Sequence, residues 1–251
     1  MGMEHRIAAQ TAAAVPRAQT EWVRETRFGR WFLGTEIWRK YVLAEALQTL
    51  ARLAGGRVQS GLHILDIGCG EGGAAALLDT HFRPQRITGV DIDAELLERA
   101  RVRVPGEPLS AGLRLTEGCA TAIPLADDAV DLVLCHQLLH HMTAQREALA
   151  EMRRVLRPGG LLLLAESCRC FIESVPVRVL FRHPAAGQRD ADGWIGLVRS
   201  AGFRLADTDI VTESPWWSLP DLGLRRRFAP GLPARPRAEP TEVLAVAEKP
   251  A

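Results

Sequence analysis

The chain has 251 residues, of which 47% are apolar and 24% are charged, and its formal net charge is +1. These values are typical of one globular domain with additions, and they give no electrostatic reason to expect nucleic acid as a partner. No apolar run approaches the roughly 20 residues that a membrane-spanning helix needs, so we expect no membrane span. The five cysteines are odd in number and lie mostly in apolar surroundings, which favours free thiols and a cytoplasmic location.

The chain divides into three predicted parts. Residues 1–20 lack the apolar core of a signal peptide and are expected to form a flexible N-terminus. Residues 21–58 are expected to form a helical cap or lid, rich in aromatic side chains. Residues 59–251 are expected to form the main domain, and within it residues 212–241 form a Pro- and Arg-rich insertion that suits a surface loop over a site.

Strand-like and helix-like runs alternate along the main domain. Strands are predicted at residues 63–67, 86–90, 113–117, 130–135, 161–165, 203–210 and 242–248. Helices are predicted at residues 74–78, 94–102, 144–156 and 191–201. Because parallel strands need long crossover connections, this alternation predicts an α/β fold with a parallel sheet.

A glycine-rich turn follows the first predicted strand. The apolar run stops at closely spaced glycines, and a helix is predicted directly after them. Such a turn leaves backbone N–H groups unpaired, and its glycines let a ligand approach the backbone closely. The pattern predicts a nucleotide-type cradle. The spacing Gly68-x-Gly70-x-x-Gly73 also satisfies the dinucleotide-binding fingerprint, so by itself it does not choose between cofactors.

Two carboxylates favour a ligand that has an amino-acid end and no phosphates. Asp66 precedes the first glycine by two positions, where a carboxylate would oppose a pyrophosphate and attract an ammonium group. Asp91 ends the second predicted strand, where its two oxygens can accept hydrogen bonds from both hydroxyls of a ribose.

Two further segments, residues 118–135 and 151–160, follow in order, and here the chain resembles the class I S-adenosylmethionine-dependent methyltransferases. The resemblance is to their small-molecule branch, which includes enzymes of ubiquinone and menaquinone biosynthesis. It is strong over residues 60–166 and looser over residues 190–250. It implies a Rossmann-like three-layer sandwich around a mostly parallel seven-stranded sheet whose last strand is antiparallel.

The resemblance also implies roles for individual residues. Asp66 and the backbone of residues 68–70 would hold the methionine end of S-adenosylmethionine, Asp91 its ribose, and Ile92 would pack against adenine. The family usually has an acid where this chain has Cys119, a poor acceptor for the adenine amino group, so a backbone group or Thr121 would serve instead. The complete expected cofactor-binding set is Asp66, Gly68, Cys69, Gly70, Asp91, Ile92, Cys119, Ala120, Thr121 and His136.

Histidines follow the fourth predicted strand, at the edge of the sheet where ligands bind in parallel α/β folds. An oxygen acceptor must lose its proton during methyl transfer, and a histidine near neutral pH suits that task. His141 is the first candidate for the general base and His136 the second. The alternative is that such an imidazole orients backbone or lines the cofactor pocket.

Metal binding is the less favoured reading of these residues. His136 and His140 would share one face of a helix, with Glu166 as a third ligand. Cys168 and Cys170 could bind a soft metal, but two thiols one residue apart on an extended chain point in opposite directions. We therefore expect no metal.

The predicted function is methyl transfer to a small, apolar or aromatic acceptor, with oxygen preferred over nitrogen or carbon as the receiving atom. The sequence has no Asn/Asp-Pro-Pro-aromatic motif after the fourth predicted strand, which argues against methylation of adenine or glutamine amides. The aromatic side chains of residues 22–41 would either cover the acceptor or pack their helix against the domain. The alternatives are a non-catalytic subunit that has kept the fold and, more distantly, a dehydrogenase. A monomer or a homodimer is expected.

Overall fold

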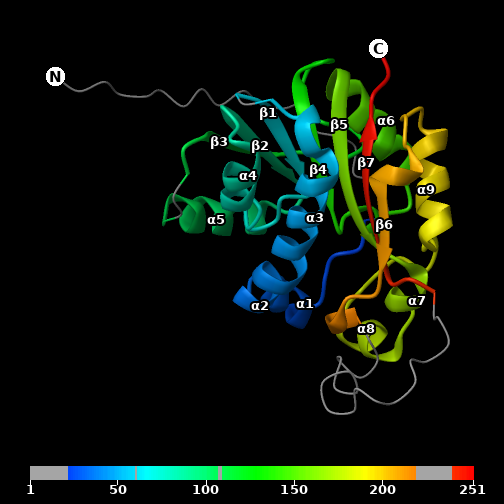
Figure 1. Cartoon of the computed structure of the whole chain (residues 1–251). Coiled ribbons are helices and arrows are strands. Elements are labelled where there is room, and N and C mark those ends of the chain that lie inside the picture. The colour runs from blue at the N-terminus through cyan, green and yellow to red at the C-terminus, as the bar shows by residue number, and fades with distance from the viewer. Residues whose placement is uncertain (1–21, 60, 107–108, 219–238) are drawn as a thin grey trace, which may run out of the picture.

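The computed structural model describes residues 22–59, 61–106, 109–218 and 239–251. Its centre is a seven-stranded sheet with the strand order β3-β2-β1-β4-β5-β7-β6 (Figure 1). The strands are β1 (His63–Ile67), β2 (Arg86–Asp91), β3 (Gly112–Glu117), β4 (Val130–His136), β5 (Leu156–Ser167), β6 (Ile210–Glu213) and β7 (Glu242–Glu248). β7 pairs antiparallel with both β5 and β6, whereas β1 to β5 pair in parallel. This confirms the predicted mostly parallel sheet with an antiparallel last strand.

Helices cover both faces of the sheet and complete the three layers. α3 (Ala44–Ala54) and α4 (Ala75–Phe82) pack on one face, where Leu47, Leu50 and Leu78 are fully buried. α6 (Gln145–Val155) and α9 (Ala191–Ser200) pack on the other face, around the buried Trp194. α5 (Ala94–Arg103) lies beside β3 and α4. Because both faces are covered, strands such as β1 are buried along nearly their whole length.

Short helices gather beyond one end of the sheet (Figure 1). α1 (Arg27–Leu33) and α2 (Glu36–Trp38) come from the N-terminal part, and α2 continues into α3 through a π-helical turn. α7 (Arg169–Ile172) and α8 (Val175–Leu180) follow β5 directly, so this end is the carboxyl edge of the parallel strands. The sequence patterns had not predicted α7 or α8.

Two predicted elements differ from the structure. The strand predicted at residues 203–210 is wrong: β6 begins only at Ile210, after a 3-10 turn at Asp207–Asp209 and an isolated bridge between Arg204 and Glu248. Arg199 donates to the carbonyl of Leu205 and to the carboxylate of Asp207, so the chain turns between the bridge at Arg204 and the start of β6. The helical cap predicted for residues 21–58 is interrupted, since residues 22–26 have no regular secondary structure and Thr26 and Thr35 cap separate helices.

Some predictions fall on residues that the structure does not describe. The flexible N-terminus predicted for residues 1–20 lies outside the described ranges, as does most of the 212–241 insertion. Within the described ranges, every helix is too short or too polar to cross a bilayer.

Candidate active site

The glycine turn after β1 is held open by hydrogen bonds to β2. Gly68 and Gly70 have φ angles of 76° and 52°, a region that favours glycine. The N–H of Gly68 donates to the carbonyl of Val90 at 2.7 Å, and the N–H of Gly70 donates to Oδ2 of Asp91 at 2.8 Å. A Cβ at Gly68 would lie only 2.8 Å from Cδ1 of Leu138. At these two positions the turn therefore presents backbone atoms and no side chain.

Asp66 and Asp91 place two buried carboxyl groups beside this turn, with exposed fractions of 5% and 9%. Burial and the neighbouring Asp91 both raise the pKa of Asp66, to about 7. Burial also raises the pKa of Asp91, although the N–H groups of Asp93 and Gly70 oppose this shift by donating to its carboxylate. A cationic group bound here would offset the cost of burying these charges.

The segment after β3 contributes further residues to the site, next to the glycine turn and Asp91. Cys119 is buried, and its Sγ lies 3.1 Å from Oγ1 of Thr121. Ile92, Cys119 and Ala120 border the same cavity as Asp91.

One cavity of about 1090 Å³ joins the glycine turn to a largely apolar chamber. Aromatic side chains from α1, α2 and the segments after α8 and β6 line the chamber, namely Phe28, Phe32, Trp38, Phe181, Trp216 and Trp217. The rings of Phe28 and Phe32 both make edge contacts with Phe181, at centroid distances of 5.7 and 5.8 Å. These aromatic side chains thus pack against one another and line the cavity at the same time.

His136, at the end of β4, faces this cavity beside Trp38, and their ring centroids are 5.8 Å apart. Its Nε2 is buried without a hydrogen-bond partner among the described residues. Burial, followed by the charge of His140, lowers the pKa of His136 to about 3. The imidazole is therefore neutral at physiological pH, with one nitrogen free to interact with a bound molecule.

The turn after β4 is organised by a buried carboxylate, Glu166 of β5. Its Oε1 accepts hydrogen bonds from the N–H groups of Leu138 and Leu139, at 3.0 and 2.6 Å. Its Oε2 lies 2.6 Å from Nδ1 of His140. Residues 139–141 form a 3-10 turn. His136 and His140 therefore do not share a helical face, and Glu166 positions the turn.

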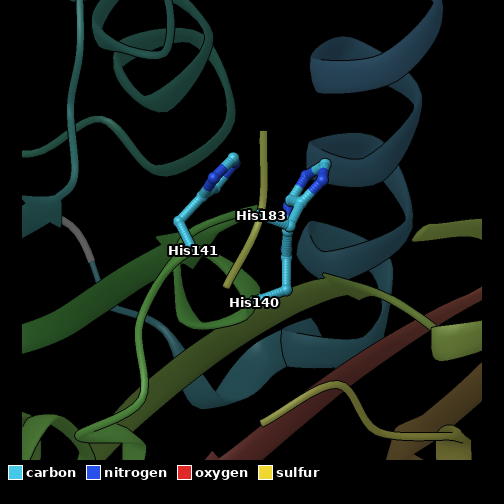
Figure 2. Close-up of side chains that lie close together, drawn as sticks. All are labelled: His140, His141 and His183. Carbon is cyan, nitrogen blue, oxygen red and sulfur yellow. The ribbon is translucent and has the colours of Figure 1, made fainter. Parts of the chain in front are cut away.

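Three imidazoles meet at this turn. His140 and His141 come from the 3-10 turn, and His183 comes from the segment after α8 (Figure 2). The ring of His141 lies 4.3 Å from that of His140 and 4.7 Å from that of His183, measured between centroids. Nδ1 of His141 also lies 3.6 Å from Oε1 of Glu25, which is slightly beyond hydrogen-bonding distance.

Residues 22–26 cross this end of the molecule without regular secondary structure, and we call them the crossing segment. Arg24 pairs with Asp93 and Glu95, beside the glycine turn. Oγ1 of Thr26 donates to the carbonyl of Leu180 at 2.6 Å, and Oε1 of Glu25 accepts from the N–H of Arg182 at 3.3 Å. The crossing segment therefore touches both the cradle and the apolar chamber.

Most of the residues predicted to form the site border this cavity: Asp66, Gly68, Cys69, Gly70, Asp91, Ile92, Cys119, Ala120, His136 and His141. Thr121 contacts the site through Cys119. Cys168 is buried in the core and Sγ of Cys170 lies 3.3 Å from the carbonyl of Pro240, so both thiols are free. Sequence reasoning missed Glu25 and His183, because each is distant in sequence from the predicted site residues and lies in a segment without a recognisable motif.

A mostly parallel α/β sheet with a glycine turn after β1, an acid at the end of β2 and a cavity over the carboxyl edge is the arrangement of a nucleotide-binding α/β domain. Residues 65–164 match the family model described as a methyltransferase domain. This match and the relatives below support a class I S-adenosylmethionine-dependent methyltransferase domain in this chain.

Relatives support this placement over part of their length. The chain is 32% identical to methyltransferase GfsG of Streptomyces halstedii over 62% of this chain and 58% of that protein. It is 33% identical to O-methyltransferase cnsE of Penicillium expansum over 61% of this chain and 56% of that protein. The chain thus spans a little more than half the length of these two relatives.

Solved structures share the fold at lower identity. A chain from the Haloferax volcanii complex between the Trm112 methyltransferase activator and a methyltransferase aligns with a TM-score of 0.66 and 20% identity. That alignment covers 89% of this chain and 96% of the other. The [4+2]-cyclase SpnF aligns with a TM-score of 0.58 and 22% identity, over 81% of this chain and 80% of SpnF. These likenesses show the fold alone.

Proposed function

We propose that this protein transfers the methyl group of S-adenosylmethionine to a small, apolar or aromatic organic acceptor, with oxygen as the preferred receiving atom. The observation that carries the proposal is the single cavity that joins the acidic cradle to the aromatic chamber. The match to relatives such as O-methyltransferase cnsE supports an oxygen acceptor. Membership of the ubiquinone and menaquinone branch, a cytoplasmic location and a monomer or homodimer stay predictions.

The residues of the cradle fit this cofactor. Asp66 would face the ammonium group of its methionine end, Asp91 would accept from the ribose hydroxyls, and Ile92 would border the adenine. The fit rests on two buried carboxyl groups whose pKa values are raised, because a bound cation and two hydroxyl donors would relieve that cost. When bound, the cofactor supplies an electrophilic methyl group on a sulfonium.

The rest of the cavity would position the acceptor and exclude water. The aromatic rings of α1 and α2 offer apolar contact, and methyl transfer needs an acceptor lone pair aligned with the methyl carbon. His141 would accept the proton of an acceptor hydroxyl, with Glu25 nearby to orient the ring. His136 would contact either the cofactor or the acceptor through its unpartnered nitrogen.

Calorimetric titration with S-adenosylmethionine and S-adenosylhomocysteine tests the cofactor. A panel of phenols, alcohols, carboxylates and amines, assayed by release of S-adenosylhomocysteine, then tests the acceptor class. Binding without turnover on any acceptor would favour a non-catalytic subunit. The acceptor panel is needed because a fold alone does not determine an activity. Displacement of the bound cofactor by NAD(H) would instead support a dehydrogenase.

A further inference from the structure

We propose that His140, His141 and His183 bind a divalent transition metal of the zinc type, and that this metal holds the oxygen of the acceptor. The second half of this statement rests on the proposed function, whereas the metal site itself does not. The ligating nitrogens of the three side chains all lie within 4.8 Å of one another (Figure 2). Three histidines with a fourth position open are a common ligand set for catalytic zinc.

The three ligands come from two segments that the fold fixes independently. Glu166 holds the turn that carries His140 and His141 through hydrogen bonds to Leu138 and Leu139. His183 follows α8, where the N–H of Arg182 donates to Glu25 and the carbonyl of Leu180 accepts from Thr26. The cluster is therefore held on both sides before any ion binds, which lowers the ordering cost of binding.

Carboxylates stand behind two of the imidazoles. Nδ1 of His140 lies 2.6 Å from Oε2 of Glu166, which leaves Nε2 as the ligand atom. Nδ1 of His141 faces Oε1 of Glu25 at 3.6 Å. A carboxylate that orients a metal-binding histidine and raises its basicity is the usual second layer of such sites.

Only a small movement is needed to complete the geometry. Zinc–nitrogen bonds of about 2.05 Å at the tetrahedral angle place the nitrogens about 3.4 Å apart. The rings of His140 and His183 are 5.1 Å apart between centroids and are tilted by 41°. Rotation about the soft second side-chain torsion can turn the nitrogens towards a common point.

The open position would face the aromatic chamber, since all three histidines border the cavity. An acceptor hydroxyl bound there would lose its proton more readily, because a divalent cation stabilises the oxyanion. The proton would pass to Glu25, and the oxygen lone pair would form the bond to the methyl carbon. The carbon–sulfur bond would break with its electron pair on sulfur, giving the methylated acceptor and S-adenosylhomocysteine.

This inference changes the expected role of His141. A metal-bound imidazole has no lone pair for a proton, so the metal and Glu25 would replace His141 as the means of deprotonating the acceptor. It also opposes the sequence-based expectation of no metal, and it uses a different set from the pairing of His136 with His140.

Titration of the metal-free full chain with Co²⁺, followed by visible absorption, tests the site. We expect one equivalent to bind with the absorption bands of a nitrogen-ligated ion, and Zn²⁺ to displace it. His183→Ala and His183→Gln should weaken Co²⁺ binding at least tenfold. His81→Ala is the matched control, because it removes an exposed imidazole of α4 outside the cavity and should leave binding unchanged.

Loss of the Co²⁺ signal in the wild-type chain, or equal affinity in the His183 variants, would overturn the inference. Binding of S-adenosylhomocysteine, measured in the same samples, shows that each variant is folded. It also separates the two proposals, because retained cofactor binding without a metal leaves the proposed function standing. Metal binding without cofactor binding would support the metal site and contradict the proposed function.

Discussion

The carboxylate of Glu166 lies 2.6 Å from Nδ1 of His140, joining the end of β5 to the turn after β4. The same carboxylate accepts from the N–H groups of Leu138 and Leu139, so one buried acid fixes the backbone on which the candidate catalytic side chains stand. Side chains held this way keep their geometry without help from a bound molecule.

Asp91→Ala should weaken S-adenosylhomocysteine binding by at least tenfold. The substitution removes the carboxylate that we propose accepts from two ribose hydroxyls, and each hydrogen bond to a charged group contributes about 1.5–3 kcal/mol. It also frees the N–H of Gly70. Calorimetry gives the affinity, and urea unfolding checks that the fold is retained. Asp91→Asn keeps one acceptor oxygen and should therefore lose less affinity than Asp91→Ala. Unchanged affinity in both variants would refute the placement of the ribose.

Cofactor affinity should depend on pH through Asp66. Its pKa is raised to about 7 in the free protein, and an ammonium group beside it would lower that pKa. Binding then releases a proton below pH 7, so affinity falls by up to tenfold for each pH unit below 7 and levels off above it. Calorimetry between pH 5.5 and 8.5 measures this. Asp66→Asn is the control and should show a flat profile; a flat wild-type profile would contradict the assignment.

His141→Ala should reduce turnover by about 10²–10⁴-fold on an acceptor found by screening, while cofactor affinity changes by less than twofold. Burial keeps the pKa of His141 well below its usual value, so turnover should not fall between pH 8 and pH 6.5 through protonation of this ring. Steady-state kinetics and calorimetry separate the two effects. Wild-type turnover in the variant would remove His141 from the mechanism, and His81→Ala should behave as wild type.

Cys119→Asp should tighten cofactor binding several-fold. The side chain borders the cavity beside Ile92, and a carboxylate there would accept from the adenine amino group more strongly than a thiol does. Titration with S-adenosylhomocysteine measures the gain, and Cys119→Ser provides a control of similar size. Weaker binding in the aspartate variant would show that the adenine amino group lies elsewhere.

Gly196→Ala should stabilise the protein by about 0.5–1 kcal/mol without changing cofactor affinity. Gly196 lies exposed within α9, and a Cβ there would meet nothing within 4 Å, so the helix propensity of alanine acts alone. Gly160→Ala is the contrast, because its Cβ would lie 3.0 Å from the carbonyl oxygen of Asp131. Urea midpoints should rise in the first variant and fall in the second.

The sequence predicted those parts that depend on local patterns. The apolar run of β1, the glycine turn and the acid at the end of β2 each lie within a few residues, so periodicity and spacing were enough to predict the turn and a parallel sheet. The antiparallel last strand was predicted from the family resemblance. The strand predicted at residues 203–210 failed because a 3-10 turn at Asp207–Asp209 separates the bridge at Arg204 from β6. The roles of the site residues stay predictions.

Features that depend on distant segments could not be read from local patterns. Glu25 and His141 approach one another across 116 positions of the chain, a separation given by 141 − 25. His183 joins them only because α8 docks against the crossing segment. The placement of Glu166 behind His140 likewise follows from the pairing of β4 with β5, which no local spacing reveals.

The crossing segment makes contacts at two separate parts of the cavity. Arg24 is tied to the acids beside the cradle, while its neighbours Glu25 and Thr26 are tied to the backbone near α8. Adjacent residues of one short segment therefore contact two different parts of the cavity wall. A displacement of the segment at one set of contacts would disturb the other set, although α5 and α8 lie far apart in the sequence.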